Sequence, residues 1–197
     1  MADAKKKEEP TKPTPEEKLA AAEAEVDALV KKGLKALDEF EKLDQKQVDH
    51  IVAKASVAAL NKHLVLAKMA VDETHRGLVE DKATKNIFAC EHVTNYLAGQ
   101  KTVGIIREDD VLGIDEIAEP VGVVAGVTPV TNPTSTAIFK SLIALKTRCP
   151  IIFGSTRAHR TAPSRPPRSF AMPLSQQALL RTVFSGSSIR PSRPLAP

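Results

Sequence analysis

The 197-residue chain has few cysteines, no long apolar stretch and no apolar segment near its start. Its two cysteines, Cys90 and Cys149, are too few for a disulfide framework and do not stand at metal-ligand spacing. The longest uncharged apolar stretch falls short of the roughly 20 residues that a membrane-spanning helix needs. The opening MADAKKKEEP lacks the apolar core of a secretory signal peptide. We therefore expect a cytoplasmic protein that does not cross a membrane.

Lysine and both acidic residue types are also missing from one segment, residues 155–197. This segment holds 7 Arg, 7 of the 14 Pro and 8 Ser, and its net charge is +7. Residues 1–154 hold 18 Lys, 3 Arg and all 24 acidic residues, and their net charge is −3. The overall charge of +4 would suggest nucleic acid or an acidic surface as partner, but it comes entirely from the tail. The abrupt change after Gly154 indicates either a genuine basic tail or a change of reading frame.

The first hundred residues carry strong helix signals. Residues 1–13, rich in Lys, Glu and Pro, are predicted to be a disordered leader. Thr14 begins a capping box with proline at the first helical position, and Asp44 caps a second helix with Gln47 three residues on. Apolar residues then recur at a period of 3.6. Four helices are predicted here, over residues 15–42, 45–60, 61–75 and 81–98.

After residue 100 the pattern becomes that of an α/β fold. Two strands over 101–106 and 113–117 are predicted to flank a turn at 107–110. Its acidic residues, Glu108, Asp109 and Asp110, are expected to be solvated rather than to form an acid–base pair. An apolar run, a helix and a short strand follow over 121–127, 134–148 and 149–153. The uninterrupted run is typical of a strand buried on both faces, so a parallel crossover unit is predicted.

The loop between that strand and that helix is the place where ligands bind in open parallel sheets. Asn132 precedes Pro133 there, and two interpretations of it stay open on spacing alone. In one, Asn132 only caps the helix. In the other, its side-chain amide donates a hydrogen bond to a developing oxyanion, as in acyl-transfer sites. The chain has no GxGxxG fingerprint for a dinucleotide.

Two long motifs carry a resemblance to a known family. They are AEPVGVVAGVTPVTNPTSTAIFKSLIALKTR at 118–148 and LAKMAVDETHRGLVEDKATKNIFACEHVTNYL at 66–97. Both resemble the acylating aldehyde dehydrogenases, in particular the N-terminal part of the bifunctional acetaldehyde-CoA/alcohol dehydrogenases, and the likeness covers about 30–154. The resemblance implies the start of an NAD-binding aldehyde dehydrogenase sheet, which is incomplete within 14–154.

The resemblance also implies a reaction and its site residues. Members interconvert an aldehyde and an acyl-CoA through a cysteine thioester, with NAD as cofactor, coenzyme A as co-substrate and iron only in the alcohol dehydrogenase half. Asn132 corresponds to the oxyanion-stabilising asparagine, and Val127, Thr128, Pro129 and Val130 to the segment beside the nicotinamide. The implied partners are small aldehydes and acyl-CoA, and the full-length enzymes self-assemble. Neither a membrane nor a specific nucleic acid is implied.

The nucleophilic cysteine of the family has no counterpart in this chain. Cys90 and Cys149 fall outside that motif, and both are expected to be buried packing residues. The spacing of His50, His63, His75 and His92 does not suggest a metal site. We therefore expect the 197-residue polypeptide to be inactive.

A single base lost after the Gly154 codon would explain the unusual tail. With that base restored, codons compatible with residues 155–192 can encode a His-Pro loop, an alanine-rich helix and a Gly-Ala-Pro turn. Members of the resembled family continue in this way. We therefore expect 155–197 to be an out-of-frame, disordered segment. The alternative is a small helical interaction protein whose basic tail binds nucleic acid.

Overall fold

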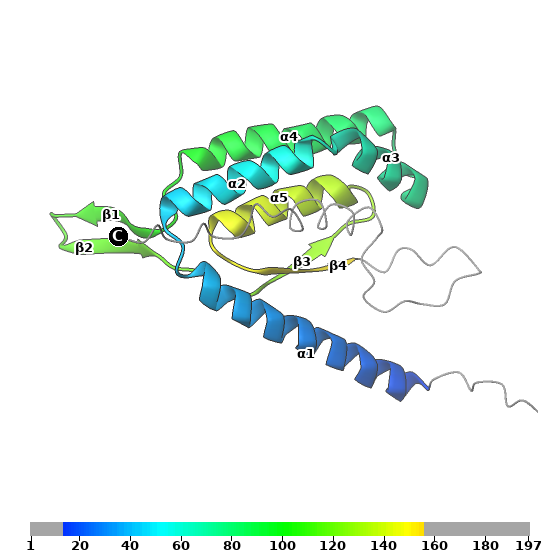
Figure 1. Ribbon diagram of the computed structural model, residues 1–197, viewed down its shortest axis with the longest axis horizontal. Coiled ribbons are helices and arrows are strands. Elements are labelled where there is room, and N and C mark those ends of the chain that lie inside the picture. Colours follow the sequence, from blue (N-terminus) through cyan, green and yellow to red (C-terminus); the bar gives the residue numbers. More distant parts are fainter. Residues whose placement is uncertain (1–13, 156–197) are drawn as a thin grey trace, which may run out of the picture.

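A computed structural model describes residues 14–155, and Figure 1 shows how their helices and strands are arranged. The leader 1–13 and the tail from 156 onward, with the disorder predicted for both, lie outside the described residues. The elements are α1 (Pro15–Phe40), α2 (Gln45–Leu60), α3 (His63–Thr74), α4 (Val79–Ala98), β1 (Gly104–Asp109), β2 (Ile114–Ala118), β3 (Val124–Thr128), α5 (Pro133–Lys146) and β4 (Ile151–Ser155). The predicted mixture of helices and strands is confirmed, and Ser155 belongs to β4 rather than to the tail.

The core lies between α2, α4 and α5, with α3 packed against α4 (Figure 1). Capping boxes at Thr14 and Asp44 begin α1 and α2 as predicted. In each box the side chain of the cap residue accepts a hydrogen bond from the backbone N–H of the residue three positions on, which is Glu17 in α1 and Gln47 in α2. The side chain of that residue in turn accepts a hydrogen bond from the backbone N–H of the cap residue. The apolar stripe of α2 is buried against the other helices at Val48, Val52, Ala55 and Ala59.

α1 carries the predicted apolar stripe, but half of that stripe is exposed and the other half only half-buried. Leu19 and Leu34 are exposed, and the single buried residue of α1 is Gly33. A Cβ on Gly33 would lie 2.9 Å from Cγ1 of Val123, so glycine allows the close approach of α1 to the segment before β3. None of the helices in residues 14–155 combines the length and the hydropathy that crossing a membrane requires.

β3, α5 and β4 form the predicted parallel unit, in which Gly126 pairs with Phe153 and Thr128 with Ser155. The prediction that this strand is buried on both faces is wrong. Gly126 and Thr128 are buried, whereas Ala125 and Val127 are exposed. The reason is that α5 packs on one face of the two-stranded sheet, and the side chains of a strand alternate between its faces. An apolar run without period cannot show how many faces are covered.

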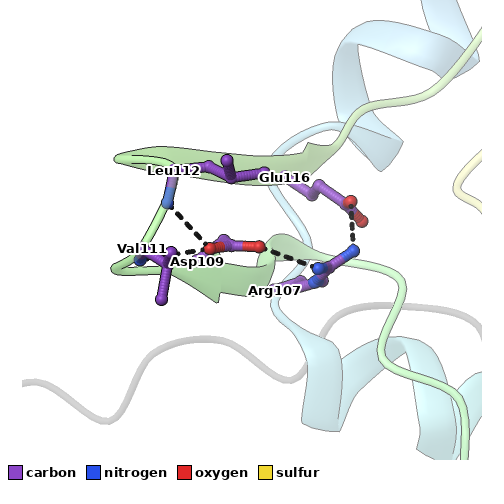
Figure 2. A network of polar contacts seen from close by, with 5 residues as sticks. All are labelled: Arg107, Asp109, Val111, Leu112 and Glu116. Atoms are coloured by element: carbon purple, nitrogen blue, oxygen red, sulfur yellow. Dashed lines mark hydrogen bonds and ion pairs between the residues drawn. The ribbon is translucent and has the colours of Figure 1, made fainter.

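The antiparallel hairpin of β1 and β2 projects from the helical body (Figure 1). Its turn lies at 110–113, and not at 107–110 as predicted, because Arg107 and Asp109 belong to β1. Figure 2 shows the polar network: Arg107 bridges Asp109 at 2.9 Å and Glu116 at 3.1 Å. The other oxygen of Asp109 accepts hydrogen bonds from the backbone N–H groups of Val111 and Leu112. Asp109 therefore holds the turn instead of standing free in solvent.

One fully buried amide joins three helices. Asn86 of α4 has no exposed area, and its Nδ2 donates to the carbonyl of His63 on α3 at 2.9 Å. Its Oδ1 accepts from the hydroxyl of Thr134 on α5, also at 2.9 Å. The side chain thus satisfies the buried hydroxyl of Thr134 and the partly buried carbonyl of His63, and fixes the start of α5 relative to α4.

We expect Asn86→Ala to lower the free energy of unfolding by about 2 kcal/mol, because it leaves a buried hydroxyl and a carbonyl without their partner. Urea unfolding followed by circular dichroism measures the change. The matched control is Asn95→Ala, an exposed asparagine of the same helix, which should change stability by less than about 0.5 kcal/mol. Equal effects of the two substitutions would contradict the bridging role.

Candidate functional site

An open pocket of about 230 Å³ lies where the loop before α5 meets the start of α4. Its lining comes from three places: the connection between α3 and α4, the first two turns of α4, and the two residues before Pro133. The lining residues are Arg76, Gly77, Leu78, Asp81, Lys82, Lys85, Thr131 and Asn132. The loop predicted to carry chemistry therefore does border a pocket, and α4 supplies the opposite wall.

Asn132 stands at the N-cap position of α5, but its side chain makes no cap hydrogen bond. Its backbone angles, φ −138° and ψ 62°, differ from the extended angles of the Thr14 and Asp44 caps. The amide oxygen Oδ1 instead accepts from Nζ of Lys85 at 3.1 Å. The interpretation of this side chain as a helix cap is therefore wrong. Lys85 of α4 donates to Oδ1 of Asn132, the oxygen that would otherwise cap α5.

The arrangement leaves the other end of the Asn132 amide available. A lysine ammonium can only donate, so its contact assigns Oδ1 to the Lys85 side and directs Nδ2 away from it. None of the residues in the described range accepts a hydrogen bond from Nδ2. A fixed amide with a free N–H₂ group is a suitable donor to a negatively charged oxygen.

Lys82 of α4 also lines this pocket. Its side chain is only 6% exposed, and its Nζ donates to the carbonyl of Thr131 at 2.6 Å. Burial, and then the neighbouring charge of Lys85, lower the pKa of Lys82 below its usual value. The lysine holds the backbone of the loop immediately before Asn132, and so helps to fix where Asn132 lies.

The four residues predicted to line the nicotinamide side surround the end of β3. Val127 is 55% exposed, and its carbonyl accepts from Nζ of Lys140 at 2.6 Å. Thr128 is buried, and its hydroxyl donates to the carbonyl of Gly154 at 3.2 Å. Pro129 is exposed and Val130 half-buried in the loop that follows. Val127 and Pro129 thus offer accessible apolar surface, while Thr128 ties β3 to β4.

Both cysteines are free and buried, as predicted. Cys90 has no exposed area in α4, and burial, with a smaller effect of Glu91, raises the pKa of its thiol to about 12. Cys149 is 2% exposed in the connection before β4, and its Sγ lies 3.3 Å from the carbonyl of Thr147. Since a thiolate is the nucleophilic form of cysteine, Cys90 is unreactive near neutral pH.

The histidines lie in different surroundings. Nδ1 of His63 lies 2.6 Å from the carbonyl of Leu60, and His92 stacks on Phe88 with ring centroids 4.8 Å apart. Within residues 14–155, no three side chains of His, Cys, Asp or Glu gather closely enough to hold a metal ion.

The wall of the pocket that α4 supplies was not predicted from the sequence. Lys82, Lys85 and Asn86 stand at positions i, i+3 and i+4, which share one face of a helix. This spacing could have shown that the three polar side chains point the same way. It could not have shown that the face is turned toward Asn132, because that depends on the packing of α4 against α5.

Three comparisons with known proteins agree. Residues 2–161 match the sequence profile described as the aldehyde dehydrogenase family. The chain is 69% identical over 140 residues to an aldehyde-alcohol dehydrogenase of Streptococcus pneumoniae serotype 4, covering 71% of this chain and 16% of the relative. It is 65% identical over 130 residues to aldehyde-alcohol dehydrogenase 2 of Entamoeba histolytica, covering 65% of this chain and 15% of that protein. The chain thus spans about one sixth of the length of these relatives.

A solved structure shares the fold of the described part. This is an acetylating aldehyde dehydrogenase from Geobacillus thermoglucosidasius, which is 38% identical in sequence and superimposes with a TM-score of 0.72. The match covers 86% of this chain and 36% of that protein.

We expect neither cysteine to react with iodoacetamide at neutral pH in the native protein, and both to react after unfolding in urea; mass spectrometry counts the adducts. Rapid native labelling of Cys90 would contradict its burial.

The free energy of unfolding should also fall at high pH. The pKa of the Cys90 thiol rises from 9.0 to about 12 on folding, so the stabilisation is complete below pH 9 and is lost as pH rises toward 12.

Proposed function

The chain belongs to the aldehyde dehydrogenase family, and on that basis we propose that it carries part of the site of an NAD-dependent acetaldehyde dehydrogenase of the acetylating type. The reaction interconverts acetaldehyde, CoA and NAD with acetyl-CoA and NADH. The observation that carries the proposal is Asn132, whose Oδ1 is held by Lys85 and whose Nδ2 is left to donate.

The proposed reaction begins with the attack of a cysteine thiolate on the aldehyde carbon. The electron pair of the carbonyl bond moves to the oxygen, which becomes an oxyanion. Nδ2 of Asn132 donates a hydrogen bond to that oxygen and lowers the energy of the adduct. The same donor serves again when the thiol of coenzyme A attacks the thioester and displaces the cysteine sulfur. A fixed donor of this kind contributes about 3–4 kcal/mol to transition-state stabilisation.

Val127 and Pro129 are the residues proposed to contact the nicotinamide, since they offer exposed apolar surface at the end of β3. NAD bound beside these residues would supply the acceptor for the hydride that leaves the aldehyde carbon. Thr128 and Val130 support this segment from the buried side of the loop. Thr128 does so through its bond to Gly154 on the neighbouring strand.

We also propose that the 197-residue polypeptide alone does not turn over. Its two cysteines are the buried Cys90 and Cys149, and the raised pKa of Cys90 keeps that thiol protonated. The out-of-frame interpretation of residues from 155 onward belongs to the same proposal. It is supported by the change of composition after Gly154 and by a family match that ends at residue 161. The rival basic-tail function depends on residues that lie outside the described range.

Self-association and a cytoplasmic location complete the proposal. The location is supported by two cysteines that are both unpaired, as is usual in a reducing compartment.

Self-association is supported by apolar side chains on the projecting hairpin. Ile105 and Ile117 face each other across β1 and β2, and both are exposed.

The catalytic proposal is tested by restoring one base after codon 154 and assaying the product for CoA- and NAD-dependent acetaldehyde oxidation. We expect activity from that product and none from the 197-residue polypeptide. Asn132→Ala should lower kcat of the restored enzyme about 10²–10³-fold, because it removes the oxyanion donor. Asn95→Ala, on an exposed asparagine, is the control and should leave kcat unchanged.

Each part of the proposal has its own contrary result. Turnover by the 197-residue polypeptide would refute its inactivity. A gene without an open frame downstream of the restored base would refute the out-of-frame interpretation. An unchanged kcat in Asn132→Ala would refute the role of the amide.

Self-association is tested by sedimentation equilibrium of the 197-residue chain and of Ile117→Lys. We expect the chain to form dimers or larger species, and the substitution to shift it toward the monomer by placing a charge on the exposed apolar face of the hairpin. Val57→Lys, at an exposed apolar position of α2 outside the hairpin, controls for added charge. A monomeric parent chain would exclude the interface.

A further inference from the structure

Three cations are buried in the described part of the chain, and two of them have a carboxylate nearby. Lys146 is 1% exposed and forms an ion pair with Asp49. Arg148 is 5% exposed and lies 3.7 Å from Glu119. Lys82 is buried to the same degree, but its one partner in residues 14–155 is the neutral carbonyl of Thr131. Burying an unpaired charge is costly, so Lys82 stands out as a cation without its counter-ion.

More positive charge converges on the same pocket. Arg76 and Lys85 line it together with Lys82, and the single carboxylate of the lining, Asp81, forms no ion pair within the described range. Two helices also begin at this wall, since Leu78 is the N-cap of α4 and Asn132 the N-cap of α5. The N-terminus of a helix carries a partial positive charge, with backbone N–H groups directed outward. The pocket therefore gathers three cations and two helix N-termini against one carboxylate.

We propose that this pocket is an anion subsite, in which Lys82, Lys85 and Arg76 hold the carboxylate, sulfonate or phosphate group of a substrate that reacts beside Asn132. The inference rests on the proposed function for the nature of the reaction and goes beyond it for the substrate, because acetaldehyde itself carries no anionic group. An oxyanion there would supply the counter-charge that Lys82 lacks. The volume of about 230 Å³ leaves room for the group and for part of the molecule that carries it.

The subsite would be coupled to the amide donor through Lys85. Nζ of Lys85 lies 3.1 Å from Oδ1 of Asn132, so the residue that would bind the anion also orients Asn132. Lys82 acts on the same loop through the carbonyl of Thr131. A correctly placed anion would therefore hold both lysines, and with them the loop from Thr131 to Asn132.

The test uses the 197-residue chain and inorganic phosphate as the probe, with isothermal titration at constant ionic strength. We expect saturable binding of one phosphate. Lys82→Met and Lys85→Gln should each weaken it about tenfold or more, because each removes a charge-assisted hydrogen bond. The matched control is Lys68→Gln, an exposed lysine on α3 outside the pocket, which should not change the affinity. Equal affinity in the parent and in Lys82→Met would overturn the subsite.

Thermal unfolding without anions separates binding from a merely structural role. Lys82→Met should keep or raise the Tm, since it removes a buried charge that has no counter-ion, whereas Lys146→Met should lower it, because it removes the ion pair between α5 and α2. Added phosphate should raise the Tm of the parent and not that of Lys82→Met. A loss of Tm in Lys82→Met as large as that in Lys146→Met would overturn the proposal.

Competition identifies the source of the anion. Displacement of phosphate by succinate would assign the subsite to the acidic tail of an aldehyde substrate. Displacement by coenzyme A, but not by phosphate-free pantetheine, would assign it to the phosphates of the acyl acceptor. Phosphate that neither competitor displaces would be an adventitious ion only and would overturn the proposal. These binding results do not depend on turnover, so they can fail while the proposed reaction stands.

Discussion

The need to satisfy buried positive charge determines how the segments of this chain meet. Arg148 follows α5 in a left-handed conformation with φ of 57°, and its guanidinium donates to the carbonyls of Glu41 at 2.8 Å and Ala118 at 3.0 Å. Those carbonyls end α1 and β2, which are far apart in sequence. One side chain thus joins the end of α1, the base of the hairpin and the turn into β4. Lys146, two residues earlier, joins α5 to α2 through Asp49.

Buried positive charge also determines the shape of the pocket, here through a backbone carbonyl instead of a carboxylate. Lys82 has only a backbone carbonyl to donate to, so the loop before α5 is drawn against α4. Asn86, one turn further on, is satisfied by groups of α3 and α5. The polar face of α4 therefore fixes the start of α5, which a helix cap would otherwise do. The side chain of Asn132 is then not needed as a cap.

Local signals in the sequence were sufficient where a structure depends on neighbours in the chain. The capping boxes at Thr14 and Asp44 place the starts of α1 and α2, and the strand–loop–helix–strand order predicts β3, α5 and β4. The predictions failed where distant groups compete. Asn132 has the sequence of a cap, but Lys85, 47 positions earlier, takes its oxygen. The hairpin turn was misplaced because the carboxylate of Asp109 serves the turn from within β1. The apolar run before the loop could not reveal which face α5 covers.

The groups around the described pocket favour the stabilisation of negative charge. Around the pocket stand an amide donor, three cations and two helix N-termini, which stabilise negative charge, against the single carboxylate of Asp81. Both thiols are buried away from it, and Cys90 is held in its protonated form. A site of this kind can stabilise an oxyanion but cannot create one, because creating one requires a nucleophile with access to the carbonyl carbon. In the proposed reaction the folded part would thus provide electrostatic preorganisation, and the nucleophile would come from outside the described residues.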